Sequence, residues 1–183
     1  NYKANGKIIA ATDSKSLLGE GTVDDLIFTR DSESDQWITK SWKAKAKINI
    51  DLAGLDLGAE AEVEYDAGVN PDQYLVKQGS KITAETSLLK AGTKLDNDMV
   101  IKQKDGKYEI EAYQVSGNLN FDIAGDLKVT GTVDYNKNGP YNYKANGEII
   151  ATTDSKSFLG AGTIDNLVFT RDSVSDQWIT KSW

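Results

Sequence analysis

Residues 1–42 of this 183-residue chain return almost unchanged as residues 142–183. Eight positions differ between the two runs. Three of these differences exchange apolar side chains of similar size, as a packed core tolerates: Leu17/Phe158, Val23/Ile164 and Ile27/Val168. Copying on this scale predicts a unit whose role is additive, such as reach or multivalency, and argues against a single tuned pocket.

A fainter copy lies between these two runs. Residues 88–136 follow the order of residues 17–66, with a shared Leu-Leu pair, Gly-Thr pair, aromatic pair and Ala-Gly turn. The repeating unit is therefore about 70 residues long. The predicted domains are β repeat unit 1 at 1–71, a divergent unit 2 at 72–141 and a partial unit 3 at 142–183, with Pro71 and Pro140 at the junctions.

The third unit stops at Trp183, whereas the first continues from Trp42 directly into an alternating run. We therefore expect residue 183 to be a cut in a longer array. A half-built sheet at this point would also be completed by a neighbouring chain through strand addition, which predicts self-association into an oligomer or filament.

The composition excludes several classes of function. The net charge of −7, with 21 basic residues interleaved among 28 acidic ones, argues against a nucleic-acid partner. No apolar run approaches the roughly 20 residues of a transmembrane helix. Cysteine and histidine are both absent, which removes the commonest nucleophiles and zinc ligands and predicts a protein that is not an enzyme. Acidic, cysteine-free repeats favour secretion or a cell surface, in a prokaryote.

Alternation of apolar and polar residues predicts an all-β, antiparallel fold. Ala44, Ala46 and Ile48 alternate with lysines, and after Ala53-Gly54 a second run alternates apolar residues with glutamates. Folding the two runs together places a lysine ladder opposite a glutamate ladder. Each unit is then a meander or sandwich of about four strands, with the first strand expected over Ala4–Thr12.

Two further signals refine the strand pattern. Asp105-Gly106 supplies the positive φ angles of a two-residue hairpin turn. The apolar parity changes between Ile110 and Tyr113, and between Trp37 and Trp42, which predicts a bulge in each of these strands, or one long strand whose two halves bury opposite faces as it crosses between sheets.

The loop at residues 31–35 places carboxylates at alternate positions, as the front half of a calcium loop does. Val174 replaces the middle acid in the copy, and no closing glutamate follows, so a solvated hairpin loop is the competing interpretation. Calcium is the one cofactor considered. Its candidate ligands are Asp31, Glu33, Asp35, Asp172 and Asp176.

Trp37 and Trp178 lie on the strand face opposite to the apolar ladder, whereas Trp42 and Trp183 share the parity of that ladder. The first pair are candidates for stacking on the sugar rings of a polysaccharide. Packing within the protein is the alternative for both, and the core is the expected place of Trp42 and Trp183.

The function that these patterns favour is a non-catalytic structural repeat protein of an extracellular fibre, surface stalk or matrix, which assembles through β-strand edges. One alternative is an adhesin-type module that binds glycan. Another is an outer-membrane β-barrel, whose strands also alternate and end in aromatic residues.

Overall fold

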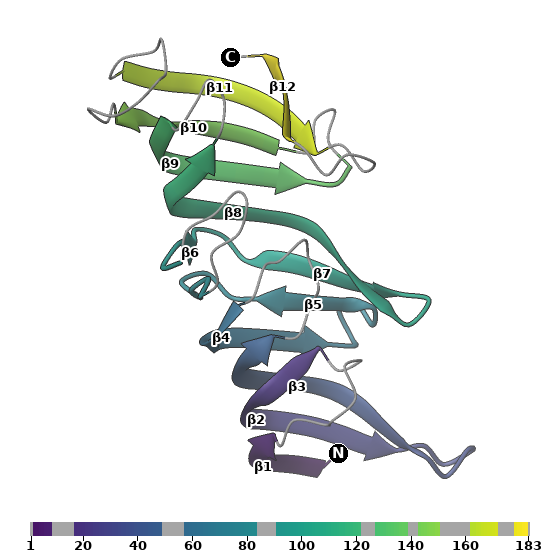
Figure 1. Cartoon of the computed structure of the whole chain (residues 1–183). Coiled ribbons are helices and arrows are strands. Elements are labelled where there is room, and N and C mark those ends of the chain that lie inside the picture. Colours follow the sequence, from purple (N-terminus) through teal and green to yellow (C-terminus); the bar gives the residue numbers. More distant parts are fainter. Residues whose placement is uncertain are drawn as a thin grey trace.

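The computed structural model describes residues 2–8, 17–48, 57–83, 91–121, 127–138, 143–150, 162–171 and 178–182. These residues form strands joined by turns and loops, and the all-β prediction is confirmed. Figure 1 shows the strands, apart from the short β6, stacked one above another in chain order. They are β1 (Tyr2–Ile8), β2 (Leu18–Arg30), β3 (Trp37–Ile48), β4 (Leu57–Asp66), β5 (Gln73–Val76), β6 (Lys94–Leu95), β7 (Met99–Lys104), β8 (Lys107–Phe121), β9 (Leu127–Asn136), β10 (Tyr143–Ile150), β11 (Gly162–Arg171) and β12 (Trp178–Ser182).

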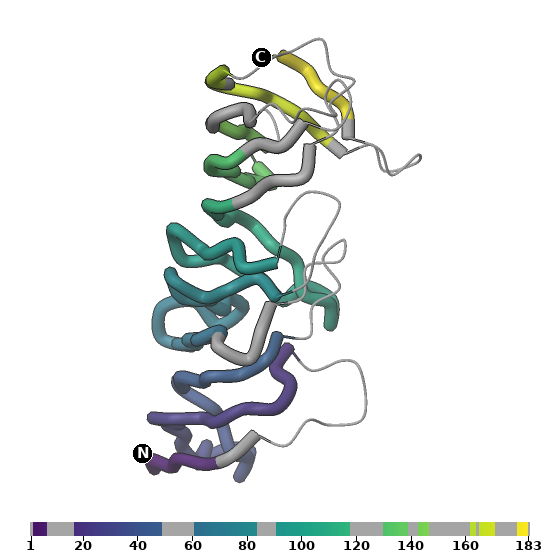
Figure 2. Tube along the Cα trace, turned by 60° about the vertical axis from the view of Figure 1, so that its left-hand side comes forward, coloured from purple at the N-terminus to yellow at the C-terminus, as the bar shows by residue number. Residues whose placement is uncertain are grey.

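The strands form one open 12-stranded sheet in the order β1-β2-β3-β4-β5-β7-β8-β9-β10-β11-β12. Every neighbouring pair is antiparallel, and β6 pairs with the second half of β8 outside this path. The predicted meander is confirmed, and the strands join a single sheet instead of two stacked ones. The two termini lie at opposite ends of the sheet in both views (Figures 1 and 2).

The sheet runs without a break through both predicted unit junctions. Pro71 lies in the turn between β4 and β5, which pair with each other, and β9 pairs with β10 across the second junction. The division into units of about 70 residues therefore stays a prediction about sequence. Among the described residues, no helix is long and apolar enough to cross a membrane.

The predicted lysine and glutamate ladders face each other in the hairpin of β3 and β4. Lys43 pairs with Glu64 and Lys45 with Glu62, while Ala44 lies opposite Val63 on the other face. Ala44 and Val63 are buried and Lys43 and Lys45 are exposed, so the alternation in the sequence is the alternation between the two faces of the sheet. A slip of one residue would exchange the faces.

Both predicted changes of parity are bulges. In β8 the pairing with β7 steps from Ile110 to Ala112, which skips one residue and turns Tyr113 toward the core. The pairing of β2 with β3 makes a similar step between Thr39 and Ser41. Asp105 and Gly106 form the predicted tight turn between β7 and β8, at φ values of 52° and 73°.

The first strand differs from its prediction at the N-terminal side. It begins at Tyr2, and the register against β2 shifts at Asn5, where two residues of β2, Asp24 and Asp25, lie opposite this one residue. Residues 9–12, which complete the predicted strand, lie outside the described residues.

The buried side chains lie on one face of the sheet and follow it across most of the strands. The chain between β5 and β7 adds to this row within the sheet: Leu95 of β6 pairs with Val115 of β8, Ile82 donates a backbone hydrogen bond to Thr93 beside it, and both side chains are buried. The cluster consists of Leu17, Ile48, Ala61, Val63, Val76, Ile82, Leu95, Met99, Ile101, Ile110, Tyr113, Val115, Val133, Ala145, Leu167 and Phe169.

Candidate functional site

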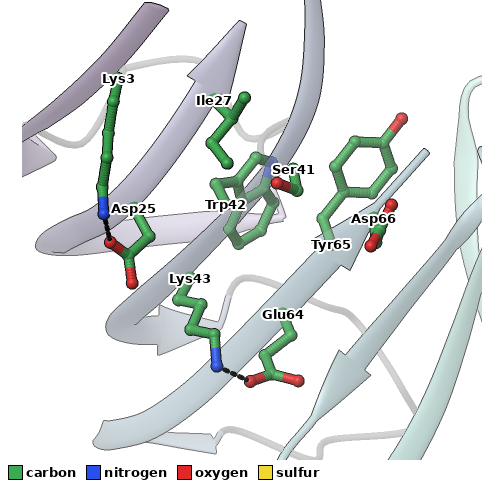
Figure 3. Close-up of a pocket in the computed structure, with 9 residues that line it drawn as sticks. All are labelled: Lys3, Asp25, Ile27, Ser41, Trp42, Lys43, Glu64, Tyr65 and Asp66. Atoms are coloured by element: carbon green, nitrogen blue, oxygen red, sulfur yellow. Dashed lines mark ion pairs between the residues drawn. The ribbon is translucent and has the colours of Figure 1, made fainter. Parts of the chain in front are cut away.

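A surface groove of about 390 Å³ lies across β1 to β4. Figure 3 shows the indole of Trp42 beside Ile27 and Tyr65, with Lys3–Asp25 and Lys43–Glu64 as ion pairs. The two ion pairs lie on the polar face, whereas the rings of Trp42 and Tyr65 belong to the face that carries Ala44 and Val63. Its lining residues are Lys3, Asp25, Ile27, Ser41, Trp42, Lys43, Glu64, Tyr65 and Asp66.

The bulge between β1 and β2 shapes this end of the groove. The side-chain oxygen of Asn5 accepts a hydrogen bond of 3.0 Å from the backbone N–H of Asp25, which has a left-handed φ of 54°. The copy makes the same contact, at 2.8 Å from Asn166 N–H to Asn146 and with the same φ. Aspartate and asparagine tolerate this backbone region better than most residues, so the substitution of Asp25 by Asn166 keeps the geometry.

A chain of charges runs from the groove across the polar face of the sheet. Lys43 contacts Glu64 at 2.7 Å, and Lys77 contacts the other oxygen of Glu64 at 3.4 Å as well as Asp98. The hydrogen bond from Lys43 lowers the pKa of Glu64, and the bond from Lys3 lowers the pKa of Asp25. Burial opposes ionisation of Asp98, but bonds from Lys77 and from the N–H of Gln78 outweigh it and lower its pKa.

These pKa directions limit the chemistry of the groove. A general acid must be protonated near neutral pH, which requires a raised carboxyl pKa. Asp25 and Glu64 have lowered values and carry lysine partners, so both are ionised. The two carboxylates are suited to fixing strand register and to hydrogen bonding, and not to donating a proton.

We expect stability to fall in acid through this chain of charges. A carboxylate whose pKa is lower in the folded protein contributes stability that is fully present above its unfolded value, about 4 to 4.5, and is lost as the pH falls through the folded value. The melting temperature should therefore be level from neutral pH down to about pH 5 and then decline. Circular dichroism melts of the protein and of Glu64→Gln measure this, with Glu33→Gln in the exposed loop as the control. An acid decline equally steep in Glu64→Gln would contradict the assignment.

Trp37, one of the two predicted sugar-stacking residues, lies at the N-terminal end of β3 and is 56% exposed. It meets Tyr2 and Phe28 edge to face, with ring centroids 5.1 and 5.2 Å away, and the Arg30 guanidinium lies 5.9 Å from its ring. The residue is thus both packed and accessible. Trp178 begins β12 opposite Arg171, and its side chain lies outside the described residues.

Trp42 packs against the core, as predicted, and also begins a row of aromatic rings that the sequence did not reveal. Trp42, Tyr65 and Tyr74 lie directly opposite one another on β3, β4 and β5, with ring centroids 5.8 and 5.1 Å apart. Tyr108 adds an edge-to-face contact at 5.7 Å. Burial, together with the neighbouring tyrosines, raises the pKa of Tyr74 to about 12. Trp183 lies outside the described residues.

Three of the five predicted calcium ligands, Asp31, Glu33 and Asp35, are described, and two of their side chains contact neighbouring residues. Asp31 accepts hydrogen bonds from the Ser34 hydroxyl at 2.5 Å and from the Ser34 N–H at 3.2 Å, and these bonds lower its pKa. Asp35 contacts Arg30 at 2.5 Å. No group of three or more acidic side chains in the described ranges is placed to hold a metal ion. Calcium binding stays a prediction, and Asp172 and Asp176 lie outside those ranges.

The chain matches no known family model, no curated protein and no solved structure.

The sheet edge at β1 adjoins the groove and the Trp37 cluster. Within the described part of the chain, β1 pairs with β2 alone, so the backbone of Tyr2–Ile8 presents a row of donors and acceptors on its outer side. Tyr2 is 56% exposed at this edge. Such an edge is chemically able to accept a further strand.

Proposed function

We propose that the protein is a non-catalytic structural repeat protein of an extracellular fibre, surface stalk or matrix, and that it assembles through β-strand edges between repeats or subunits. The observation that carries this proposal is the open sheet whose strands follow chain order from β1 to β12, with the termini at opposite ends (Figure 1). Each added strand lengthens such a sheet by about 4.8 Å, so copying units adds reach.

Composition supports the proposed location outside a prokaryotic cell. The chain has no cysteine that an oxidising environment would modify. Its net charge of −7 keeps neighbouring sheets apart through repulsion, while edges such as β1 remain open for pairing. Length and solubility are the properties that these features supply together.

Negative-stain electron microscopy combined with analytical ultracentrifugation of the full chain tests the proposal. We expect association that increases with protein concentration and produces elongated particles, one sheet wide. Thioflavin binding and the far-ultraviolet spectrum show whether the particles keep the native sheet content. Compact monomers at every concentration, with no elongated particles, would contradict the proposed function.

A glycan-binding adhesin module is the second candidate, and the exposure of Trp37 favours it. Aromatic side chains that remain accessible on a sheet bind sugars by stacking on their apolar faces. Retention of Trp37→Ala on cellulose and chitin, compared with the parent chain, tests this candidate. Ile38→Ala, at a neighbouring exposed apolar position, is the matched control. A binding platform loses retention while its melting temperature is unchanged, whereas a structural tryptophan lowers the melting temperature and leaves retention unchanged.

A further inference from the structure

The repeat allows the open edge of β1 to be compared with a strand of nearly the same sequence, β10, that is paired on both sides. β1 and the matching part of β10 have the same sequence except that Lys7 corresponds to Glu148. Both strands pair with the strand that follows them, in the same register and with the same bulge. β10 also pairs with β9 on its other side. The structure therefore shows what this strand sequence binds when its second edge is occupied.

The aromatic rings reveal the difference between the two edges. Tyr143 on β10 stacks on Phe169 at 5.2 Å and meets Tyr135 of β9 at 4.9 Å on its other side. The corresponding Tyr2 stacks on Phe28 at 5.7 Å. Among the described residues, no strand equivalent to β9 lies beside β1, and Tyr2 stays 56% exposed.

Other apolar side chains near these rings are also more buried beside β10 than beside β1. Ala145 is fully buried on β10, whereas Ala4 at the same position of β1 is only partly buried. Phe169 is 2% exposed, whereas Phe28 is partly exposed. Identical side chains are thus covered where β9 is present and less covered where it is not.

We propose that the open edge of β1 is a docking site for a β-strand of the β9 type, residues 127–136, supplied by a second molecule. The register is the one that β9 adopts on β10, which places the equivalent of Tyr135 opposite Tyr2 and that of Val133 opposite Ala4. This inference rests on the proposed function, because it names the strand that edge assembly would add.

The residues of β9 suit this edge beyond the backbone pairing. In the β10 register Asp134 lies opposite Lys144, so a docked strand would set its aspartate opposite Lys3. Gly131 lies opposite Gly147 and would lie opposite Gly6, so neither strand carries a side chain at this position. Glu148 pairs with Thr130 in this register, and threonine carries no charge, so we expect the exchange of Lys7 for glutamate to have little effect on docking.

Fluorescence anisotropy with the labelled peptide LKVTGTVDYN, residues 127–136, tests the docking on the intact chain. We expect saturable one-to-one binding to the parent protein and none by a scrambled peptide. Ala4→Lys places a charge where the docked strand would bury it and should weaken binding more than tenfold. Lys7→Glu, the residue of the copy, should bind as the parent does. Melting curves must show that both variants fold.

Alternate N-methylation of the peptide provides a second measurement. A strand that docks by one edge directs every other N–H toward the protein. A peptide methylated on these N–H groups should therefore not bind, whereas a peptide methylated on the alternate N–H groups, which point away, should bind as before. Equal binding by Ala4→Lys, or no binding by a folded parent protein, overturns the assignment.

The outcomes separate this inference from the proposed function. Elongated particles without peptide binding overturn the β9-type docking and leave edge assembly in place. Association of the chain that Ala4→Lys blocks, again without peptide binding, means that two β1 edges pair with each other and also overturns the assignment. Peptide binding by a chain that never assembles supports the docking site and contradicts the structural function.

Discussion

Substitution of Gly21 by alanine should destabilise the protein by about 3 kcal/mol, at the upper end of the usual cost of overpacking. Gly21 lies opposite Ala46 where β2 and β3 approach closely. A Cβ atom at this position would overlap the carbonyl oxygen of Lys45 and lie 2.5 Å from the Cβ of Ala46. These are backbone atoms and a first side-chain atom, which cannot rotate away, so β2 would have to move off β3.

The repeat supplies the matched control for this prediction. Gly162 is the copy of Gly21, and a Cβ there meets no described atom within 4 Å. Gly162→Ala should therefore change the free energy of unfolding by less than about 1 kcal/mol, or increase it slightly, because alanine restricts the unfolded chain. Chemical denaturation of the two variants measures both values. Equal destabilisation by the two substitutions would show that the close approach of β2 and β3 is not the reason for the effect at Gly21.

The sequence predicted the local pairing well, because local pairing depends on residues close together in the chain. Alternation of lysine with alanine in β3 and of glutamate with apolar residues in β4 specifies both the faces and the register of that hairpin. Asp105-Gly106 specifies a two-residue turn through its backbone angles. The change of apolar parity near Tyr113 indicated either a bulge or a strand that crosses between two sheets, and the register of β7 and β8 shows the bulge.

The sequence did not predict the single sheet or the aromatic row, and the reason is physical. Alternation identifies an apolar face without identifying what covers it, so a sandwich and one continuous sheet give the same pattern. The Trp42, Tyr65 and Tyr74 row depends on the turn from β4 to β5, where the Asp66 side chain accepts a 2.8 Å hydrogen bond from Gly68 N–H. Gly68 and Pro71 mark a junction in the sequence, but they do not specify that the chain returns to pair β5 with β4. The aromatic–aromatic pair across the β3–β4 hairpin was the one available signal.

Some residues of the candidate site were predicted from the sequence, and others were not. Trp37 was identified because its parity differs from that of the apolar ladder, and it is exposed. The ion pair between Lys43 and Glu64 followed from the two ladders, but the extension through Lys77 to Asp98 joins segments that only the folded sheet brings together. The open edge of β1 became interpretable through its copy, which the structure pairs on both sides.

Ile101→Ala should be the most destabilising truncation in the middle of the sheet, at about 3 kcal/mol, within the range for removing a buried isoleucine side chain. Ile101 is fully buried on β7, opposite Ile110 of β8 and Tyr74 of β5. The adjacent Val100 points to the other face and is only partly buried. Val100→Ala is the matched control and should cost roughly 1 kcal/mol or less.

Hydrogen exchange of the same two variants tests whether the sheet behaves as one body across residue 71. β7 is joined to β4 through β5, and Val63, Val76 and Met99 form one buried row across the predicted junction. If stability is shared along this ladder, Ile101→Ala should increase exchange from β4 amides as well as from β7 and β8, by on the order of a hundredfold for 3 kcal/mol. Exchange that increases in β7 and β8 while β4 is unchanged would instead mean that the units of about 70 residues unfold independently, as stacked repeats can.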